Sequence, residues 1–288
     1  MNVRFSLSLT SCRSRFGDPR HFVRLIGVIG IAFLLSPLAE ARTRLAQDDN
    51  RLAPIQREIE RQRQRLGSAE VEERRDALMR LGNLKRPEAS RAAAASLNDA
   101  VPVVRVTAAH AILSLPSREA ASLLIALLGD KSEFVRREAA YALGETRDRS
   151  AVAGLTDTLL GDKQASVRAA AAIALGQIGD ETAVPVLSQA LVGDPKLKKK
   201  PDKDPFVMRS AARSLGQIRS RAAIPALIGT LENPKNVLDT RREAATALGI
   251  IGDASAIPAL QAAFAADEDP YLSEAARVAI RKINKVKN

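Results

Sequence analysis

The sequence predicts an all-α fold, an α-α superhelix of about six tandem helical hairpins followed by a terminal cap helix. The block FVRREAAYALGET at 134–146 recurs along residues 68–288, every 31 to 33 residues except where a loop is inserted. Each copy has the apolar spacing of a helix. Aromatic residues make up 3% of the chain and Trp is absent, so the core must consist of small and aliphatic side chains.

The first helix of each hairpin is predicted from this recurring block. In the copy at 134–146, Val135, Ala139, Ala142 and Leu143 fall on one stripe, and Gly144 is expected to end the helix. Further copies occupy 166–178 and 206–218 and begin at residues 72, 103, 239 and 271.

The second helix is predicted from another block, AVPVLSQALVGD at 183–194, with copies at 151–162, 223–234 and 256–267. Pro185 falls in its first turn, where a missing N–H does no harm. Gly-Asp pairs at 129–130, 161–162 and 193–194 are expected to supply a helix stop and a turn residue. One hairpin cannot bury its apolar stripe alone, so neighbouring hairpins must stack.

The two blocks, VRxxAAxALGxIG and AIPxLxxxL, resemble the HEAT-like repeats of the PBS-lyase type over roughly three quarters of the chain. The resemblance implies a HEAT-like solenoid whose concave face is lined by the VRxxAA helices. It also implies a ladder in which Arg105, Arg136, Arg168 or Arg241 bonds to turn aspartates such as Asp130 and Asp162. A charge that recurs in every repeat is interpreted as structural, because it satisfies exposed turn backbone.

Specificity is expected where the repeats differ. The variable positions of the first helices would form a groove of mixed polarity, with each residue merely solvated as the alternative. The candidate partner-binding residues are Met79, His110, Tyr141, Ile173, Gln177, Arg213, Gln217 and Thr246.

Residues 1–41 are typical of a cleavable signal peptide, with an apolar run at 25–35 and a small-x-small triplet at 39–41. A periplasmic or secreted protein is therefore expected. The alternatives are a membrane anchor at 22–39 and a transit peptide, and Val23 is an alternative start. The sole cysteine, Cys12, lies in the removable segment, so a mature chain would form no disulfide.

Two further segments depart from the repeats. Residues 42–67 predict one or two amphipathic helices that cap the open end of the stack or form a coiled coil with a partner. A lysine-rich insertion at 195–205 is interpreted as a docking loop for phosphate, anionic lipid or an acidic partner, or otherwise as a flexible solvated loop. Its lysines are Lys196, Lys198, Lys199, Lys200 and Lys203.

The net charge of +11 favours an anionic partner, such as an acidic protein. Export and the scarcity of aromatic residues disfavour nucleic acid. Membrane binding is expected only if the N-terminal apolar run is kept as an anchor.

Two catalytic groups share these repeats. Deoxyhypusine hydroxylase holds two irons with paired His-Glu motifs, whereas the mature chain has one histidine, His110, followed by Ala111. Bilin lyases act in the cytoplasm, which conflicts with export. A HEAT-like DNA glycosylase needs aromatic residues and a catalytic Asp in a groove, whereas this chain has no Trp and only two tyrosines, Tyr141 and Tyr271. No catalytic residue, metal or cofactor is expected.

The sequence therefore predicts an exported, non-catalytic scaffold that binds a protein through its concave face. The alternative is a phycobilin-lyase-like or chaperone-type protein that modifies a protein client.

Overall fold

The computed structural model describes residues 54–193, 200–266 and 269–287. The chain divides into two compact units, 1–58 and 59–288, and of the first unit only residues 54–58 are described, which are helical. The predicted signal peptide, its anchor alternative, Cys12 and three lysines of the insertion (Lys196, Lys198 and Lys199) lie outside the described residues. Within the described ranges every regular element is a helix.

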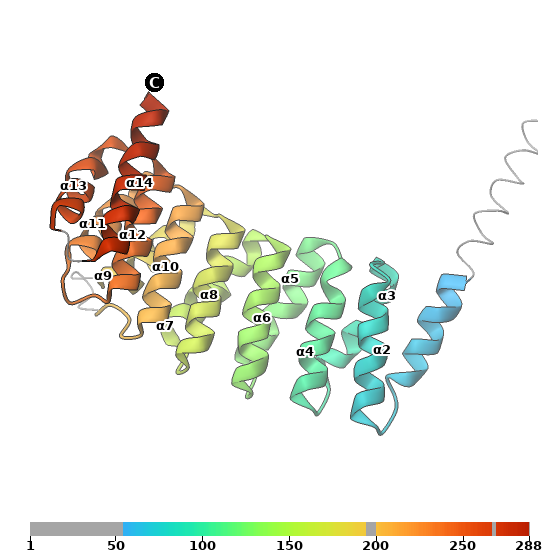
Figure 1. Cartoon of the computed structure of the whole chain (residues 1–288). Coiled ribbons are helices and arrows are strands. Elements are labelled where there is room, and N and C mark those ends of the chain that lie inside the picture. Colours follow the sequence, from blue (N-terminus) through green and yellow to red (C-terminus); the bar gives the residue numbers. More distant parts are fainter. Residues whose placement is uncertain (1–53, 194–199, 267–268, 288) are drawn as a thin grey trace, which may run out of the picture. The chain divides into compact units, whose positions relative to one another are not determined.

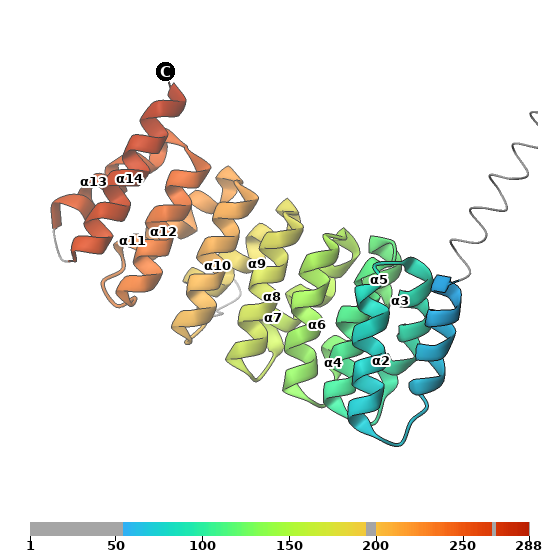
Figure 2. The ribbon, with the colours of Figure 1, turned by 45° about the vertical axis from the view of Figure 1, so that its right-hand side comes forward.

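The second unit is built of two layers of helices (Figures 1 and 2). The first layer consists of α2 (Val71–Asn83), α4 (Pro102–Ala111), α6 (Glu133–Thr146), α8 (Ala165–Ile178), α10 (Pro205–Ile218), α12 (Leu238–Ile251) and α14 (Pro270–Lys287). The second layer consists of α3 (Pro87–Ala93), α5 (Ser117–Ile125), α7 (Val152–Gly161), α9 (Val184–Val192), α11 (Ile224–Glu232) and α13 (Ile257–Ala266). The described helices thus form six pairs and a final helix, as predicted.

Short 3-10 turns lead into or out of the second-layer helices. Three of these turns begin after an aspartate whose carboxylate accepts the backbone N–H two residues later. They are Arg149–Ala151, Glu181–Ala183 and Ala254–Ala256. Pro185 lies in the first turn of α9, as expected. The core between the layers is almost entirely Ala, Leu, Val and Ile, which agrees with the composition.

Adjacent helices of the first layer approach backbone to backbone at glycine. A Cβ on Gly144 of α6 would lie 2.9 Å from Cα of Ala174 on α8, and one on Gly249 of α12 would lie 2.7 Å from Cα of Ala279 on α14. The prediction that Gly144 ends its helix is wrong, because α6 continues to Thr146 and ends at Arg147, which is left-handed with φ 53°. The glycine is present for interhelical contact.

The helix that precedes α2 extends to residue 65 and is joined to α2 by charge. Arg65 Nη1 lies 2.7 Å from Asp76 Oδ2, and Arg65 Nε lies 3.3 Å from Glu73 Oε1. Ile59 and Gln62 of this helix are buried. These contacts agree with a helix that caps the first hairpin.

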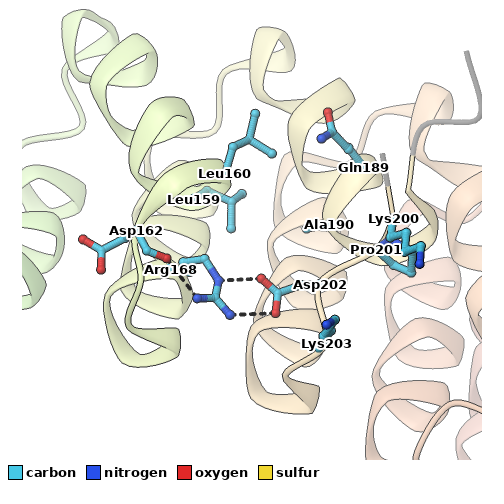
Figure 3. A pocket seen from close by; sticks show the side chains of 10 residues that line it. All are labelled: Leu159, Leu160, Asp162, Arg168, Gln189, Ala190, Lys200, Pro201, Asp202 and Lys203. Atoms are coloured by element: carbon cyan, nitrogen blue, oxygen red, sulfur yellow. Dashed lines mark hydrogen bonds and ion pairs between the residues drawn. The ribbon is translucent and has the colours of Figure 1, made fainter. Parts of the chain in front are cut away.

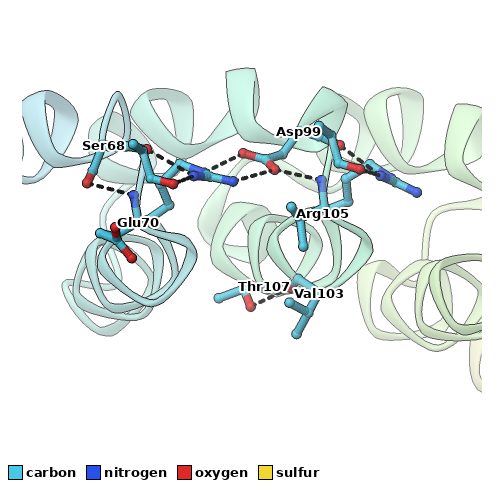
Figure 4. Close-up of polar contacts among 10 residues, drawn as sticks. Ser68, Glu70, Asp99, Val103, Arg105 and Thr107 are labelled. Carbon is cyan, nitrogen blue, oxygen red and sulfur yellow. Dashed lines mark hydrogen bonds and ion pairs between the residues drawn. The ribbon is translucent and has the colours of Figure 1, made fainter.

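An arginine–aspartate ladder links successive repeats. Arg105 bonds both carboxylate oxygens of Asp130 at 2.8 and 2.7 Å, and Arg136 bonds those of Asp162 at 2.6 and 3.1 Å. The Nη1 of Arg105 also donates to the carbonyl of Asp99, at the preceding turn (Figure 4). Each arginine therefore joins its own turn to the next one, which confirms the predicted ladder at these repeats.

The ladder is longer at one end than predicted and is interrupted at the other. Arg74 bonds Asp99 at 2.8 and 3.0 Å, a further rung. In α10 the arginine position holds Met208, and the aspartate position of the following turn holds Asn233, so the rung between α10 and α12 is absent. Arg241 of α12 donates from Nε to the carbonyl of Leu231 at 2.8 Å.

Candidate functional site

The predicted partner-binding residues share one face of the first layer. They lie on α2, α4, α6, α8, α10 and α12, and all are exposed or half-buried. Figure 1 shows these helices side by side. We call this surface the first-layer face; it consists of Met79, His110, Tyr141, Ile173, Gln177, Arg213, Gln217 and Thr246.

All five aromatic side chains in the described part of the chain lie outside the core. Phe134, Phe206 and Tyr271 are 36%, 43% and 71% exposed, although each sits in the first turn of a first-layer helix. Tyr141 is half-buried on the same layer and Phe264 lies on α13. Solvent-exposed aromatic rings on a rigid surface are the side chains most often used to anchor a partner.

An arginine guanidinium stacks over each of the three exposed first-layer rings. Arg137 lies 5.3 Å from the ring centre of Phe134, and Arg209 lies 5.2 Å from that of Phe206. These two pairs were not among the predicted site residues, although an aromatic residue three positions before an arginine in one helix is a signal for them. The third pair joins Arg242 of α12 to Tyr271 of α14, at 5.4 Å, and depends on helix stacking.

Ion pairs between neighbouring helices balance the charge of the first-layer face. Arg213 of α10 bonds Glu243 of α12 at 3.1 and 3.0 Å, which raises the pKa of Arg213. His110 Nε2 of α4 lies 3.5 Å from Glu138 Oε2 of α6. His110 therefore faces a carboxylate on the surface and is not packed in the core.

The middle of the face, on α8, is uncharged. Ala169 and Ala170 are fully buried, and the side chains that reach the surface include Ile173 and Gln177. The neighbouring helices carry Arg137 and Glu138 on α6 and Arg213 on α10. A neutral strip with charged residues on both sides matches the mixed apolar and polar character of protein–protein contacts.

The described cavities lie away from this face, near the turns that follow the second-layer helices. One of about 410 Å³ lies beside Arg168, whose guanidinium is already bonded to Asp202 at 2.6 and 2.9 Å (Figure 3). Lys200, Pro201 and Lys203 also line it. Because Arg168 is already paired, the polar groups that line the cavity and remain for a ligand are the ammonium groups of Lys200 and Lys203 and the amide of Gln189.

The bounds of the lysine-rich insertion differ from those expected. Asp202 accepts the N–H of Asp204, as Asp162 accepts that of Gln164, so the repeat turn resumes at Asp202. The residues in excess of the repeat are therefore 194–201, in place of the expected 195–205. Lys203 occupies the position that Lys131 and Lys163 hold in earlier turns, and only Lys200 among the described lysines belongs to the inserted residues.

The pKa values of three ladder aspartates, Asp99, Asp130 and Asp162, lie below their ordinary value. Burial by itself raises the pKa of Asp162, but the hydrogen bonds from Arg136 and from the N–H of Gln164 outweigh burial and hold that pKa below its ordinary value. Across the described ranges no cluster of His, Cys, Asp and Glu is arranged to hold a metal ion. None of the described helices has the length and apolarity of a membrane span.

Comparison with known proteins agrees with the fold. A family model described as HEAT repeats matches residues 59–141, 122–200 and 195–281. A search of curated proteins finds no match.

Solved structures with a similar fold include YibA of Escherichia coli, with a TM-score of 0.54 and 18% identity over 80% of this chain and 82% of that one. The CpcE–CpcF complex of phycocyanin lyase from Nostoc is also similar, with a TM-score of 0.46 and 24% identity over 79% and 94% of the two chains. Human deoxyhypusine hydroxylase follows, with a TM-score of 0.40 and 21% identity over 80% and 96%. At these identities the likeness concerns the fold alone. Since the family model spans most of the sequence, the chain belongs to the HEAT repeat proteins.

Proposed function

We propose that this chain is a non-catalytic scaffold that holds a segment of a protein partner on its first-layer face. The observation that carries the proposal is that eight side chains which vary between the repeats, among them Tyr141 and Ile173, lie exposed or half-buried on side-by-side helices of one layer (Figure 1). Met79 and Ile173 leave apolar surface in contact with water in the folded chain, and a partner that covers this surface would gain free energy by removing it from water.

The charge pattern favours a protein segment over a polyanion. Arg137 and Arg213 are already paired with Glu138 and Glu243, so the face presents balanced charge with a neutral strip on α8. A polyanion would need unpaired cations in a row. A polypeptide that carries apolar, acidic and basic groups can meet each of these features separately.

We also propose that the scaffold acts after export, as a periplasmic or secreted protein. The support is the N-terminal signal pattern in the sequence. A reporter fused to the C-terminus that is active only outside the cytoplasm tests this part by itself. A reporter active only in the cytoplasm would reject export and would favour the lyase-like alternative.

Site-directed photo-crosslinking tests the binding face. A photoreactive residue in place of Tyr141, Ile173 or Arg213 should form an adduct with one and the same protein in the native compartment. The matched control carries the label at Gln261, which is exposed on α13 in the second layer. Equal adducts from both layers, or different proteins at each first-layer position, would contradict the proposal.

The same captured partner decides between a scaffold and a modifying protein. A scaffold leaves the covalent mass of its partner unchanged and stays bound to it. A partner that is released with an altered mass, as measured by mass spectrometry, would reject the non-catalytic reading. The variant that combines Tyr141→Ala with Ile173→Ala should lose the partner, whereas Gln261→Ala should keep it.

A further inference from the structure

Exposed apolar residues gather at one edge of the repeat stack. This edge holds the turns that join each second-layer helix to the next first-layer helix, seen at the lower ends of α4, α6 and α8 in Figure 1. Nine large apolar side chains are exposed in the described residues, and all except Met79 lie at this edge. They are Phe134, Leu160, Val192, Phe206, Val237, Leu238, Phe264 and Tyr271.

Lysines occupy the same edge at a regular spacing. Four of the turns at this edge each carry an exposed lysine: Lys131, Lys163, Lys203 and Lys235. Among the described residues none of these four forms an ion pair, and the neighbouring Asp130, Asp162 and Asp202 are neutralised by arginines of the ladder. We call this combination of lysines and exposed apolar residues the lysine edge.

The opposite edge of the stack is different in kind. Its turns contain none of the exposed large apolar side chains. They carry ion pairs instead, such as Arg149 with Asp180 at 3.2 Å and Arg221 with Asp253 at 3.0 Å. The contrast shows that exposed apolar residues are not a general property of the turns of this chain.

We infer that the lysine edge lies on the surface of a membrane that contains anionic phospholipid. Phe, Tyr and Leu side chains enter the interfacial region of a bilayer, and lysine ammonium groups meet the phosphate groups while their aliphatic stems stay in apolar surroundings. This inference goes beyond binding at the first-layer face. It also differs from the expectation that only a retained N-terminal anchor would bring the chain to a membrane.

The charge of the lysine edge is complementary to that of an anionic membrane. Basic residues outnumber acidic ones in each of the four turns, taken as 129–137, 161–168, 200–209 and 232–242. A basic residue near an anionic bilayer contributes about 1 kcal/mol, or about fivefold in partition.

The spacing argues against a protein as the occupant of the same edge. Protein anchors cluster at the centre of an interface and fill pockets in the partner. The apolar residues of the lysine edge are spread over the ends of α6, α7, α9, α10, α12, α13 and α14. A lipid surface accepts such separated side chains because it needs no matched shape.

Tryptophan fluorescence in the full chain tests the inference, because the natural chain has no Trp. Phe206→Trp places the reporter at the lysine edge, and Ser150→Trp places it at the opposite edge, where Ser150 is exposed. Vesicles of phosphatidylglycerol and phosphatidylcholine should shift the emission of the first variant to shorter wavelength, and brominated lipid should quench it. Vesicles of phosphatidylcholine alone should leave it unchanged, and the second variant should not respond to either. Both variants contain residues 1–53, so any membrane affinity of that segment is common to them.

Matched charge reversals provide the second measurement. Glutamate at Lys131, Lys163, Lys203 and Lys235 should lower partition onto the anionic vesicles at least about tenfold. Glutamate at four exposed basic residues of the opposite edge makes the same change in net charge and should lower partition by no more than about twofold. These control positions are Lys85, Arg86, Arg147 and Arg219.

Three outcomes would overturn the inference. One is an emission of Phe206→Trp that anionic vesicles leave unchanged. Another is an equal loss of partition in both charge-reversed chains, which would show an effect of net charge alone. The third is a shift of Phe206→Trp with soluble polyglutamate but not with vesicles, which would assign the edge to an acidic protein. Should a charge-reversed chain lose its helical circular dichroism, the pair of Trp variants decides the question.

Discussion

Replacement of Gly249 by alanine tests how the first layer is packed. A Cβ at this position of α12 would lie 2.7 Å from both Cα and Cβ of Ala279 on α14. The Cα belongs to the backbone, so no side-chain rotation relieves the contact and α14 must move away from α12. The substitution therefore acts on the contact between the last two helices of the first layer.

The expected magnitude follows from two opposing effects. Helix propensity alone predicts that Gly→Ala inside a helix stabilises the protein by about 1 kcal/mol. Overpacking of a close-packed interior costs about 1–3 kcal/mol, and contact with backbone places Gly249 at the upper end of that range. We expect the free energy of unfolding to fall by about 1–2 kcal/mol.

Gly161→Ala is the matched control. Gly161 is the last residue of α7, and no atom lies within 4 Å of its ideal Cβ position. Only the propensity effect remains there, so the free energy of unfolding should rise, by about 0.5 kcal/mol at a helix end.

Urea unfolding followed by far-UV circular dichroism measures both variants. Hydrogen exchange should also show faster amide exchange in α14 of Gly249→Ala. If Gly249→Ala is as stable as the natural chain or more stable, glycine is not required for the approach of α12 and α14, and the packing argument fails.

Three further predictions concern the turns and the ladder. Arg147 has a left-handed backbone conformation with φ 53°, so Arg147→Gly should raise the free energy of unfolding by about 1 kcal/mol in urea titrations. Gly179 is left-handed at the equivalent position of the next repeat, so Gly179→Ala should lower the free energy of unfolding. Equal stability of the two variants would refute this prediction. Asp162→Asn weakens the paired hydrogen bonds from Arg136 and should cost about 1–3 kcal/mol, while Asp157→Asn on the surface of α7 should cost less than about 0.5 kcal/mol. The pKa of Asp162 is lower in the folded chain than its ordinary value, so the stability it contributes is complete above the unfolded-state pKa and is lost as pH falls through the folded one. The urea midpoint should therefore decline below about pH 4, and an equally steep decline in Asp162→Asn would contradict the assignment.

Local residue patterns were enough to predict the hairpins, and the resemblance to HEAT-like repeats implied most of the ladder. The apolar stripe of each block and Pro185 act within one helix, and the structure has helices in those places. Arg105 and Arg136 pair with the predicted aspartates because their repeats have no inserted residues. Arg168 could not be assigned in this way, since its partner Asp202 follows the inserted residues and is separated from it by 34 positions.

Gly144 shows why a local rule can fail. Glycine near the end of a helical block is compatible with a helix stop and with a close interhelical contact, and the sequence of one helix does not distinguish them. The contact with Ala174 decides the matter, and Ala174 belongs to the next repeat. The pair formed by Arg242 and Tyr271 was missed for the same reason, because its two members lie on different helices.

The sequence alone determined the hairpin repeat, the two kinds of helix and the residues that vary between repeats. Each of these depends on periodicity within a few helical turns, and the apolar spacing is the same whatever the neighbouring repeat does. Only the tertiary structure decided which helices touch at glycine, which charges pair and which edge exposes apolar residues beside lysine. These features depend on the register between helices about 30 residues apart in the chain, and packing across the whole stack sets that register.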